Sequence, residues 1–332
     1  DRHPQGDFFV CDIFDAAPKG DMASMEHPIF SLSTKPDTRA RKYEHNGNSI
    51  EIKPSVDGLA TVHDRDILIY CISQLMVAIN NNKPVSQNVR FKAYDLLVAT
   101  NRNTAGTGYA QLKASLERLA GTRISTNIVT GGTEVFRTFG LIESAEIVRQ
   151  TREGRMQEVE IKLSDWVFNA IKSKEVLTLH RDYFRLRKPL ERRMYELARK
   201  HCGSQSTWRI GLPLLQKKCG SNSTLREFRR LVLTIIKEDM LHLHFPDYAV
   251  TFEDENDIVA FSNRGTMLLK QNVVTTPPLD PEIYETARAL APGWDVRCLE
   301  SEWRAWIKET PRNHEAAFLG FCRKWFEKRG HP

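Results

Sequence analysis

Residues 183–201 read YFRLRKPLERRMYELARKH, and residues 219–237 read CGSNSTLREFRRLVLTIIK. In the first stretch, Pro189 stands where a proline opens a helix, and apolar residues then recur at helical spacing. The second stretch begins with a glycine turn, and Thr224 and Glu227 then form a capping box, which satisfies backbone N–H groups at a helix start. A helix, a tight turn and a second helix that displays three arginines indicate a helix-turn-helix.

Positive charge is concentrated in the same region. Between Arg181 and Lys237 there are 15 Lys or Arg against 4 Asp or Glu, a net charge of +11, whereas the whole chain carries only +6. Arg226, Arg229 and Arg230 fall on one face of the predicted helix over 224–237. A solvated face is the alternative, but three uncompensated arginines repel one another unless a polyanion binds them. The pattern therefore favours nucleic acid as the partner.

Two short runs of alternating apolar residues follow, separated by a turn at Pro246-Asp247. The alternating residues are Leu241, Leu243 and Phe245, and then Tyr248, Val250 and Phe252. Such alternation predicts a β-hairpin. A hairpin directly after a helix-turn-helix is the wing of a winged-helix domain.

The preceding part of the chain repeats this order. Leu112, Leu116 and Leu119 bury one face of a predicted helix, and the period changes to two from Ile124 onward. Turns at 131–132 and 153–155 then divide a predicted three-strand sheet that ends near residue 163. We therefore predict an α+β fold with two tandem winged-helix domains and a small C-terminal helical unit.

The predicted domain boundaries follow from these patterns and from the prolines. They are an N-terminal arm over 1–54, a first winged-helix domain over 55–170, a second over 171–265, a linker over 266–279 and the helical unit over 280–332. In the last unit Trp303, Trp306 and Trp325 lie on helical stripes. These tryptophans either form a core or, next to Lys and Arg, stack single-stranded bases.

Composition excludes several classes of protein. The six cysteines form no C-x-x-C pair, which fits reduced thiols in a bacterial cytoplasm better than a disulfide framework or a zinc site. No apolar run approaches the ~18 residues of a membrane span. There is no G-x-x-x-x-G-K-[ST] phosphate loop, and we expect no cofactor, no metal and no catalytic residue.

Several segments resemble the plasmid replication initiator protein A family. They are HPIFSL at 27–32, YEHNG at 43–47, DILIY at 66–70, DLLVATNR at 95–102, LSDW at 163–166 and the long run over 183–201. The resemblance covers roughly residues 26–264. It implies an initiator that binds repeated origin sequences, called iterons, through two winged-helix domains.

The resemblance also implies partners. Such initiators promote opening of adjacent AT-rich DNA and bring in the host initiator DnaA and the replicative helicase or its loader. Many repress their own promoter as dimers, and the first domain supplies the dimer interface. Double-stranded DNA of the plasmid origin is thus the expected ligand, with homodimerisation and single-stranded DNA at the C-terminal unit as further possibilities.

The recognition helices implied are residues 108–119 and 224–237, which would enter major grooves about 10 bp apart. Arginine pairs with guanine and glutamine with adenine, so the base-reading candidates are Gln111, Arg226, Arg229 and Arg230. The phosphate-binding candidates are Lys113, Arg187, Lys188, Arg193, Lys217, Lys218, Ser221 and Ser223. Tyr109 is a further candidate, with packing against the sheet as its alternative. For Arg192 and Arg193 the alternative is a structural pair with Glu191 or Glu196.

Other functions fit parts of the pattern. His242 and His244 alternate as in the metal-binding motif of rolling-circle nicking enzymes, with Tyr248 nearby as a nucleophile. A plain winged-helix transcriptional regulator, or a segregation protein that coats DNA without sequence preference, would use the same basic surface. Specificity over random duplex separates these functions.

Overall fold

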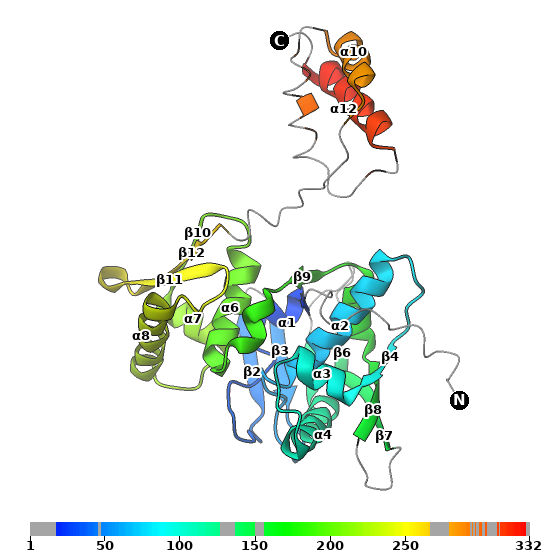
Figure 1. Cartoon of the computed structure of the whole chain (residues 1–332). Coiled ribbons are helices and arrows are strands. Elements are labelled where there is room, and N and C mark those ends of the chain that lie inside the picture. The colour runs from blue at the N-terminus through cyan, green and yellow to red at the C-terminus, as the bar shows by residue number, and fades with distance from the viewer. Residues whose placement is uncertain are drawn as a thin grey trace. The chain divides into compact units, whose positions relative to one another are not determined.

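The computed structural model describes residues 18–45, 48–126, 137–149, 156–265 and 279–292, and parts of 294–329 (294, 296, 299–300, 303, 311 and 313–329). The chain divides into two compact units, residues 1–264 and 265–332. The described residues form ten α-helices and four small antiparallel sheets, so the α+β class is confirmed (Figure 1). Among them, no helix has the length and apolarity needed to cross a membrane.

Two stretches of the first unit have the same order of elements. Each contains a helix, a strand, two helices and a β-hairpin, and in the first stretch β5 (Arg123–Thr126) and β6 (Arg137–Gly140) are inserted before the hairpin. In the first stretch these are α2 (Arg65–Asn80), β4 (Asn88–Lys92), α3 (Ala93–Ala99), α4 (Gly106–Gly121), β7 (Ile142–Arg149) and β8 (Met156–Leu163). In the second they are α6 (Pro189–His201), β10 (Thr207–Gly211), α7 (Leu212–Cys219), α8 (Leu225–His242), β11 (Tyr248–Glu253) and β12 (Ile258–Asn263).

The two sheets of this repeat also share one strand order. The first is β4-β8-β7 and the second is β10-β12-β11, so in both the last strand pairs with the other two. In the second sheet Ile210 and Phe252 both lie opposite Val259. Figure 1 shows the two stretches as neighbouring halves of the first unit. We call them the first and second halves.

Additional elements surround the first half. They are β1 (Lys19–Asp21), α1 (Met22–Glu26), β2 (Arg41–His45), β3 (Asn48–Lys53), β5 (Arg123–Thr126), β6 (Arg137–Gly140), α5 (Asp165–Lys172) and β9 (Val176–Thr178), with 3-10 turns at Arg181–Arg185 and Asp254–Asn256. The predicted three-strand sheet that ends near residue 163 is wrong, because β5 and β6 belong to a separate sheet, β2-β3-β5-β6. Strand β3, from the predicted arm, pairs with β5, and β2 pairs with β3 on its other side, so the segment is divided between two sheets.

Local signals explain α8 and its entry. The hydroxyl of Thr224 accepts a hydrogen bond from the Glu227 backbone N–H at 3.3 Å, which is one half of the predicted capping box, whereas the Glu227 carboxylate accepts from Arg230. Before it, Gly220 adopts φ +69°, and a Cβ there would lie 2.7 Å from Cβ of Pro28. Glycine is therefore required at this turn on two counts, conformation and space.

The end of α8 corrects a prediction. The helix continues to His242 and ends at Leu243, which adopts the left-handed conformation with φ 49°. The hairpin predicted over 241–252 is therefore wrong, and the observed hairpin is β11–β12, which turns at 254–257. The helix continues because Ile235, Ile236 and Asp239 all face the interior. The alternation of leucines at 241 and 243 reflects a helix end and not a strand.

The second unit contains α10 (Pro281–Leu290) and α12 (His314–Arg329). Trp303 is fully buried with Phe318 and Cys322, so a core role is confirmed for this tryptophan. Trp325 is half-buried and contacts Trp294 edge-on. Trp306 and most of the predicted 266–279 linker lie outside the described residues.

Candidate nucleic-acid interface

The exposed face of α8 carries the basic residues expected for DNA. Arg226, Arg230 and Lys237 are exposed, and their spacings of four and seven residues place them on one side of the helix. The structure gives the side chain of Arg226 no ion pair or hydrogen bond within the described part of the chain. Lys237 was not singled out from the sequence, although its helical spacing from Arg230 was the signal that identifies it.

The other two arginines of the triplet have carboxylate partners. Arg229 contacts Asp254 at 3.0 Å and Asp257 at 2.9 Å, and its guanidinium lies 5.0 Å from the ring centre of Phe252. Arg230 pairs with Glu227 at 2.6 Å. The premise that the triplet is uncompensated is therefore wrong. These pairs are exposed, and exposed pairs are worth little, so a phosphate can replace the carboxylates at small cost.

Helix α4 presents the corresponding face in the first half. Gln111 and Lys113 are exposed, and Lys113 pairs with Glu117 at 3.7 Å. Tyr109 is half-buried and packs against the core of the first half, as its packing alternative predicts. Gln111 and Lys113 therefore remain candidates for contacts from this helix.

Two predicted phosphate contacts are buried instead, and both predictions are corrected. Arg193 is 2% exposed, and its guanidinium donates hydrogen bonds to the carbonyls of Ser24 and Met25 at 3.0 and 2.9 Å, and to that of Lys218 at 2.8 Å. It also pairs with Glu196 at 3.2 Å, which confirms its structural alternative. No N–H group of Arg193 is left for a phosphate. The residue fastens α1 to α6 and α7.

Lys218 is the second buried cation. Its ammonium pairs with the carboxylate of Glu26, which also lies 2.8 Å from the imidazole of His201. Burial by itself would raise the pKa of Glu26, but hydrogen bonds from His201 and Lys218 outweigh it and hold that pKa far below its ordinary value. This cluster attaches α1 to the second half. Lys218 is thus a structural residue.

A network of buried charges joins the two halves. Arg192 of α6 donates to Asp66 of α2 at 2.5 Å, and Arg65 of α2 pairs with Glu196 of α6. Arg102 lies 3.5 Å from Asp66 on its other side. Arg192 thus has a structural role, with Asp66 as its partner in place of the predicted Glu191 or Glu196.

The remaining phosphate candidates lie on the surface. Arg187, Lys188 and Lys217 are exposed, and Lys217 lies 5.7 Å from the ring centre of Tyr43. Ser221 and Ser223 are half-buried and share a hydrogen bond of 2.9 Å in the turn before α8. All five remain predictions.

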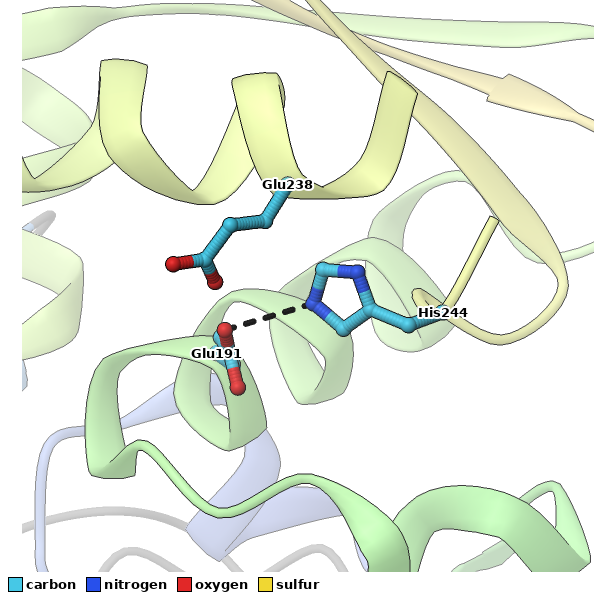
Figure 2. A group of neighbouring side chains, drawn as sticks. All are labelled: Glu191, Glu238 and His244. Carbon is cyan, nitrogen blue, oxygen red and sulfur yellow. Dashed lines mark hydrogen bonds and ion pairs between the residues drawn. The ribbon is translucent and has the colours of Figure 1, made fainter. Parts of the chain in front are cut away.

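The histidine pair does not form the expected metal motif. His242 is in the last turn of α8, and His244 lies beyond it beside Glu191, whose carboxylate is 3.3 Å from the imidazole. Figure 2 shows His244 and Glu191 facing Glu238. Lys188 pairs with both Glu191 and Glu238, so its ammonium already supplies the cation that these carboxylates require. The strand arrangement of His242 and His244 predicted for a nicking enzyme is therefore wrong.

Comparisons with known proteins identify one family and one similar fold. The Replication initiator protein A family matches residues 19–250. A protein of Wigglesworthia glossinidia brevipalpis named "Putative replication protein" is 40% identical over 263 residues, which cover 78% of this chain and 94% of that protein. A crystal structure of domains 2 and 3 of RctB is similar with a TM-score of 0.52 at 13% identity, over 70% of this chain and 94% of that chain. At this identity the likeness to RctB concerns the fold alone.

Proposed function

Because the chain belongs to the Replication initiator protein A family, we propose that it is a replication initiator that binds repeated duplex sequences at a plasmid origin. The single observation that carries the proposal is the repeated arrangement of the two halves. Each has a helix, a strand, two helices and a hairpin, and each sheet has the same strand order. We interpret each half as a winged-helix domain.

In this interpretation α4 and α8 are the recognition helices, since each is the last helix before the hairpin. Both present polar and basic side chains that can reach base edges and phosphates. Gln111 and Lys113 do so on α4, and Arg226, Arg230 and Lys237 on α8. Two such helices held in one compact unit suit a site with two adjacent major-groove segments.

The wider role follows from the proposal. Binding at the origin would promote opening of adjacent DNA and recruitment of host DnaA and the replicative helicase, and binding at the promoter would repress the gene. The protein would act in the bacterial cytoplasm, by binding and without bond chemistry. A homodimer would be the active form at one of the two DNA sites, the origin or the promoter. The basic residues of α12 remain candidates for single-stranded DNA, since Arg323 and Lys324 are exposed.

The test is fluorescence anisotropy of the full chain with duplexes that carry the repeats of its own plasmid origin and with scrambled duplexes. Titrations across a salt series, with EDTA present, give both the affinity and the number of phosphates neutralised. We expect a preference of about 10³ or more for the repeats. Equal affinity for both duplexes would contradict the proposal and leave a nonspecific DNA-binding protein.

A further inference from the structure

A cavity of about 490 Å³ lies beside α4, where residues of both halves meet. Its walls include the loop at 34–36, the start of α2, the segment at 100–103 and the exposed side of α4. The second half contributes Arg192, and the segment that precedes it contributes Arg187. Gln111, a base-reading candidate, lines the same cavity, so the cavity adjoins the proposed DNA-binding face of α4.

The lining carries an excess of positive charge. Five basic residues and two carboxylates line it, which leaves a net +3 with its histidine neutral; the basic ones are Lys35, Arg102, Arg118, Arg187 and Arg192. Both carboxylates are already paired. Asp64 accepts two hydrogen bonds of 2.7 Å from Arg118, and Asp66 lies between Arg192 and Arg102.

Two of the cations are not neutralised in this way. Lys35 and Arg187 are exposed, and the structure places no carboxylate within ion-pair distance of either side chain among the described residues. Lys35 comes from the loop at 34–36 and Arg187 from the segment that precedes α6. Like charges at one cavity whose carboxylates are already paired with other arginines create a site for an anion.

The pKa of His63, the histidine that lines the cavity, depends on its burial and on the neighbouring charges. Burial, and next to it the charge of Arg192, lower the pKa of His63 to about 4. His63 is therefore neutral at physiological pH and does not add to the charge. An anion in the cavity would favour the protonated ring and raise this pKa, so His63 reports on occupancy.

The chemistry of the lining matches a phosphate better than a base. Threonine, serine and asparagine side chains surround the cations, at Thr34, Thr61, Thr100, Asn101, Asn103 and Ser115. No Phe, Tyr or Trp lines the cavity as far as the chain is described, so there is no ring of these types on which a base could stack. Hydroxyl, amide and cationic donors are the groups that bind phosphate oxygens.

We propose that this cavity holds one backbone phosphate of the bound DNA, with Lys35 from the loop at 34–36 and Arg187 from the segment before α6 as its cationic contacts. The inference rests on the proposed function and adds two things to it. Lys35 becomes a DNA contact that the basic stretch over 181–237 does not contain. Arg187 becomes a residue that contacts the same phosphate as Lys35, so two segments more than 150 residues apart in the chain engage one strand at one point.

The test combines variants with neutralised phosphates. Duplexes that carry a single uncharged methylphosphonate at successive positions are titrated against the full chain and against Lys35→Ala and Arg187→Ala. We expect one position at which the methylphosphonate weakens wild-type binding by about tenfold. On the duplex that carries the methylphosphonate at that position, each variant should bind as tightly as the wild type does, since the phosphate contact is already absent. Each variant should also lower the salt slope by about one and leave the preference for origin repeats unchanged.

Matched controls separate this contact from net charge. Arg185→Ala removes an exposed arginine two residues before Arg187 that pairs with Asp182 at 3.1 Å and does not line the cavity. Lys42→Ala removes an exposed lysine that is seven residues after Lys35 in the sequence and does not line the cavity. Both should retain the full methylphosphonate effect. Unfolding midpoints of all four variants should match the wild type, because the side chains are exposed.

Three outcomes would overturn the inference. The first is origin binding that is specific but equally weakened by Arg185→Ala and Arg187→Ala. The second is a methylphosphonate effect that is as large in both cavity variants as in the wild type. The third is an NMR shift of His63 caused by inorganic phosphate or a free nucleotide and not by the duplex, which would make the cavity a small-molecule site. In all three outcomes the wild type still prefers its repeats, so they overturn this inference and leave the proposed function intact.

Discussion

Arg226 and Arg193 belong to the same basic stretch but have opposite environments. Arg226 is exposed on α8, whereas Arg193 is buried with its guanidinium on backbone carbonyls of α1 and α7. A count of charges along the sequence treats them alike. Burial decides which one is available to a ligand, because a buried guanidinium that is fully hydrogen-bonded has no donor left.

Arg226→Ala should weaken binding to origin repeats by about 1–3 kcal/mol and relax specificity at one base pair, if the arginine reads a guanine. A loss that is uniform across sequences would assign Arg226 to a phosphate. Anisotropy with single-base variants of the repeat distinguishes these results. The exposed side chain makes few contacts, so stability should change by less than about 0.5 kcal/mol. Unchanged affinity for every duplex would remove Arg226 from the interface.

Glu26 makes the stability of the folded protein depend on pH in the acid range. Because its folded-state pKa lies below its ordinary value of 4.5, the folded protein is stabilised at pH values above 4.5 and loses this stabilisation as the pH falls. Glu26→Gln should therefore be less stable than wild type at neutral pH and should lose less stability between about pH 5 and pH 3. Urea unfolding at a series of pH values measures this. Glu146→Gln, an exposed control on β7, should follow the wild type.

At the scale of elements, α8 shows what local sequence can and cannot predict. Its start was predictable, because Thr224, Glu227 and Gly220 act within a few residues of each other. Its end was not predictable, because Leu241 and Leu243 alternate as apolar residues do in a strand. The helix extends to His242 because Ile236 and Asp239 are buried against the core. Asp239 also accepts a hydrogen bond of 2.8 Å from the backbone of Phe245, and that contact fixes the chain beyond the helix.

The same limit applies to the candidate interface. Sequence patterning correctly predicted an exposed basic face for α8, since helical spacing alone defines that face. It could not predict that Arg193 reaches the carbonyls of Ser24 and Met25, which are 169 and 168 residues away in the chain. Nor could it predict that β3 pairs with β5. Such contacts depend on tertiary packing, which residue spacing does not encode.

The residue that follows α8 offers a test of helix termination. Leu243 adopts a left-handed conformation that costs a branched side chain about 1 kcal/mol, and its side chain is 70% exposed, so little burial offsets the cost. Leu243→Gly should raise the free energy of unfolding by up to about 1 kcal/mol. Met240→Gly, in an exposed position inside the same helix, should lower it by about 1 kcal/mol. Urea denaturation of both variants checks the sign, and two losses of equal size would contradict this account.

At the scale of the whole molecule, the first unit is a pair of halves joined through buried charges. Arg192 to Asp66 and Arg65 to Glu196 both cross from α6 to α2. A buried ion pair contributes little net stability over apolar residues of the same size, but loss of one partner leaves an uncompensated charge. We therefore expect the halves to be coupled, so that α2 and α6 unfold together.

Asp66→Asn tests this coupling, because it leaves Arg192 and Arg102 without their carboxylate. We expect a loss of about 3–5 kcal/mol in the free energy of unfolding. Native-state hydrogen exchange should show equal opening free energies for the α2 and α6 amides in the wild type and different ones in the variant. Asp182→Asn, which removes only the surface contacts of this carboxylate with Arg185 and His180, should leave the exchange pattern unchanged. If α2 and α6 already open independently in the wild type, the halves act as separate domains. A rigid spacing between α4 and α8 would then come from the DNA and not from the protein.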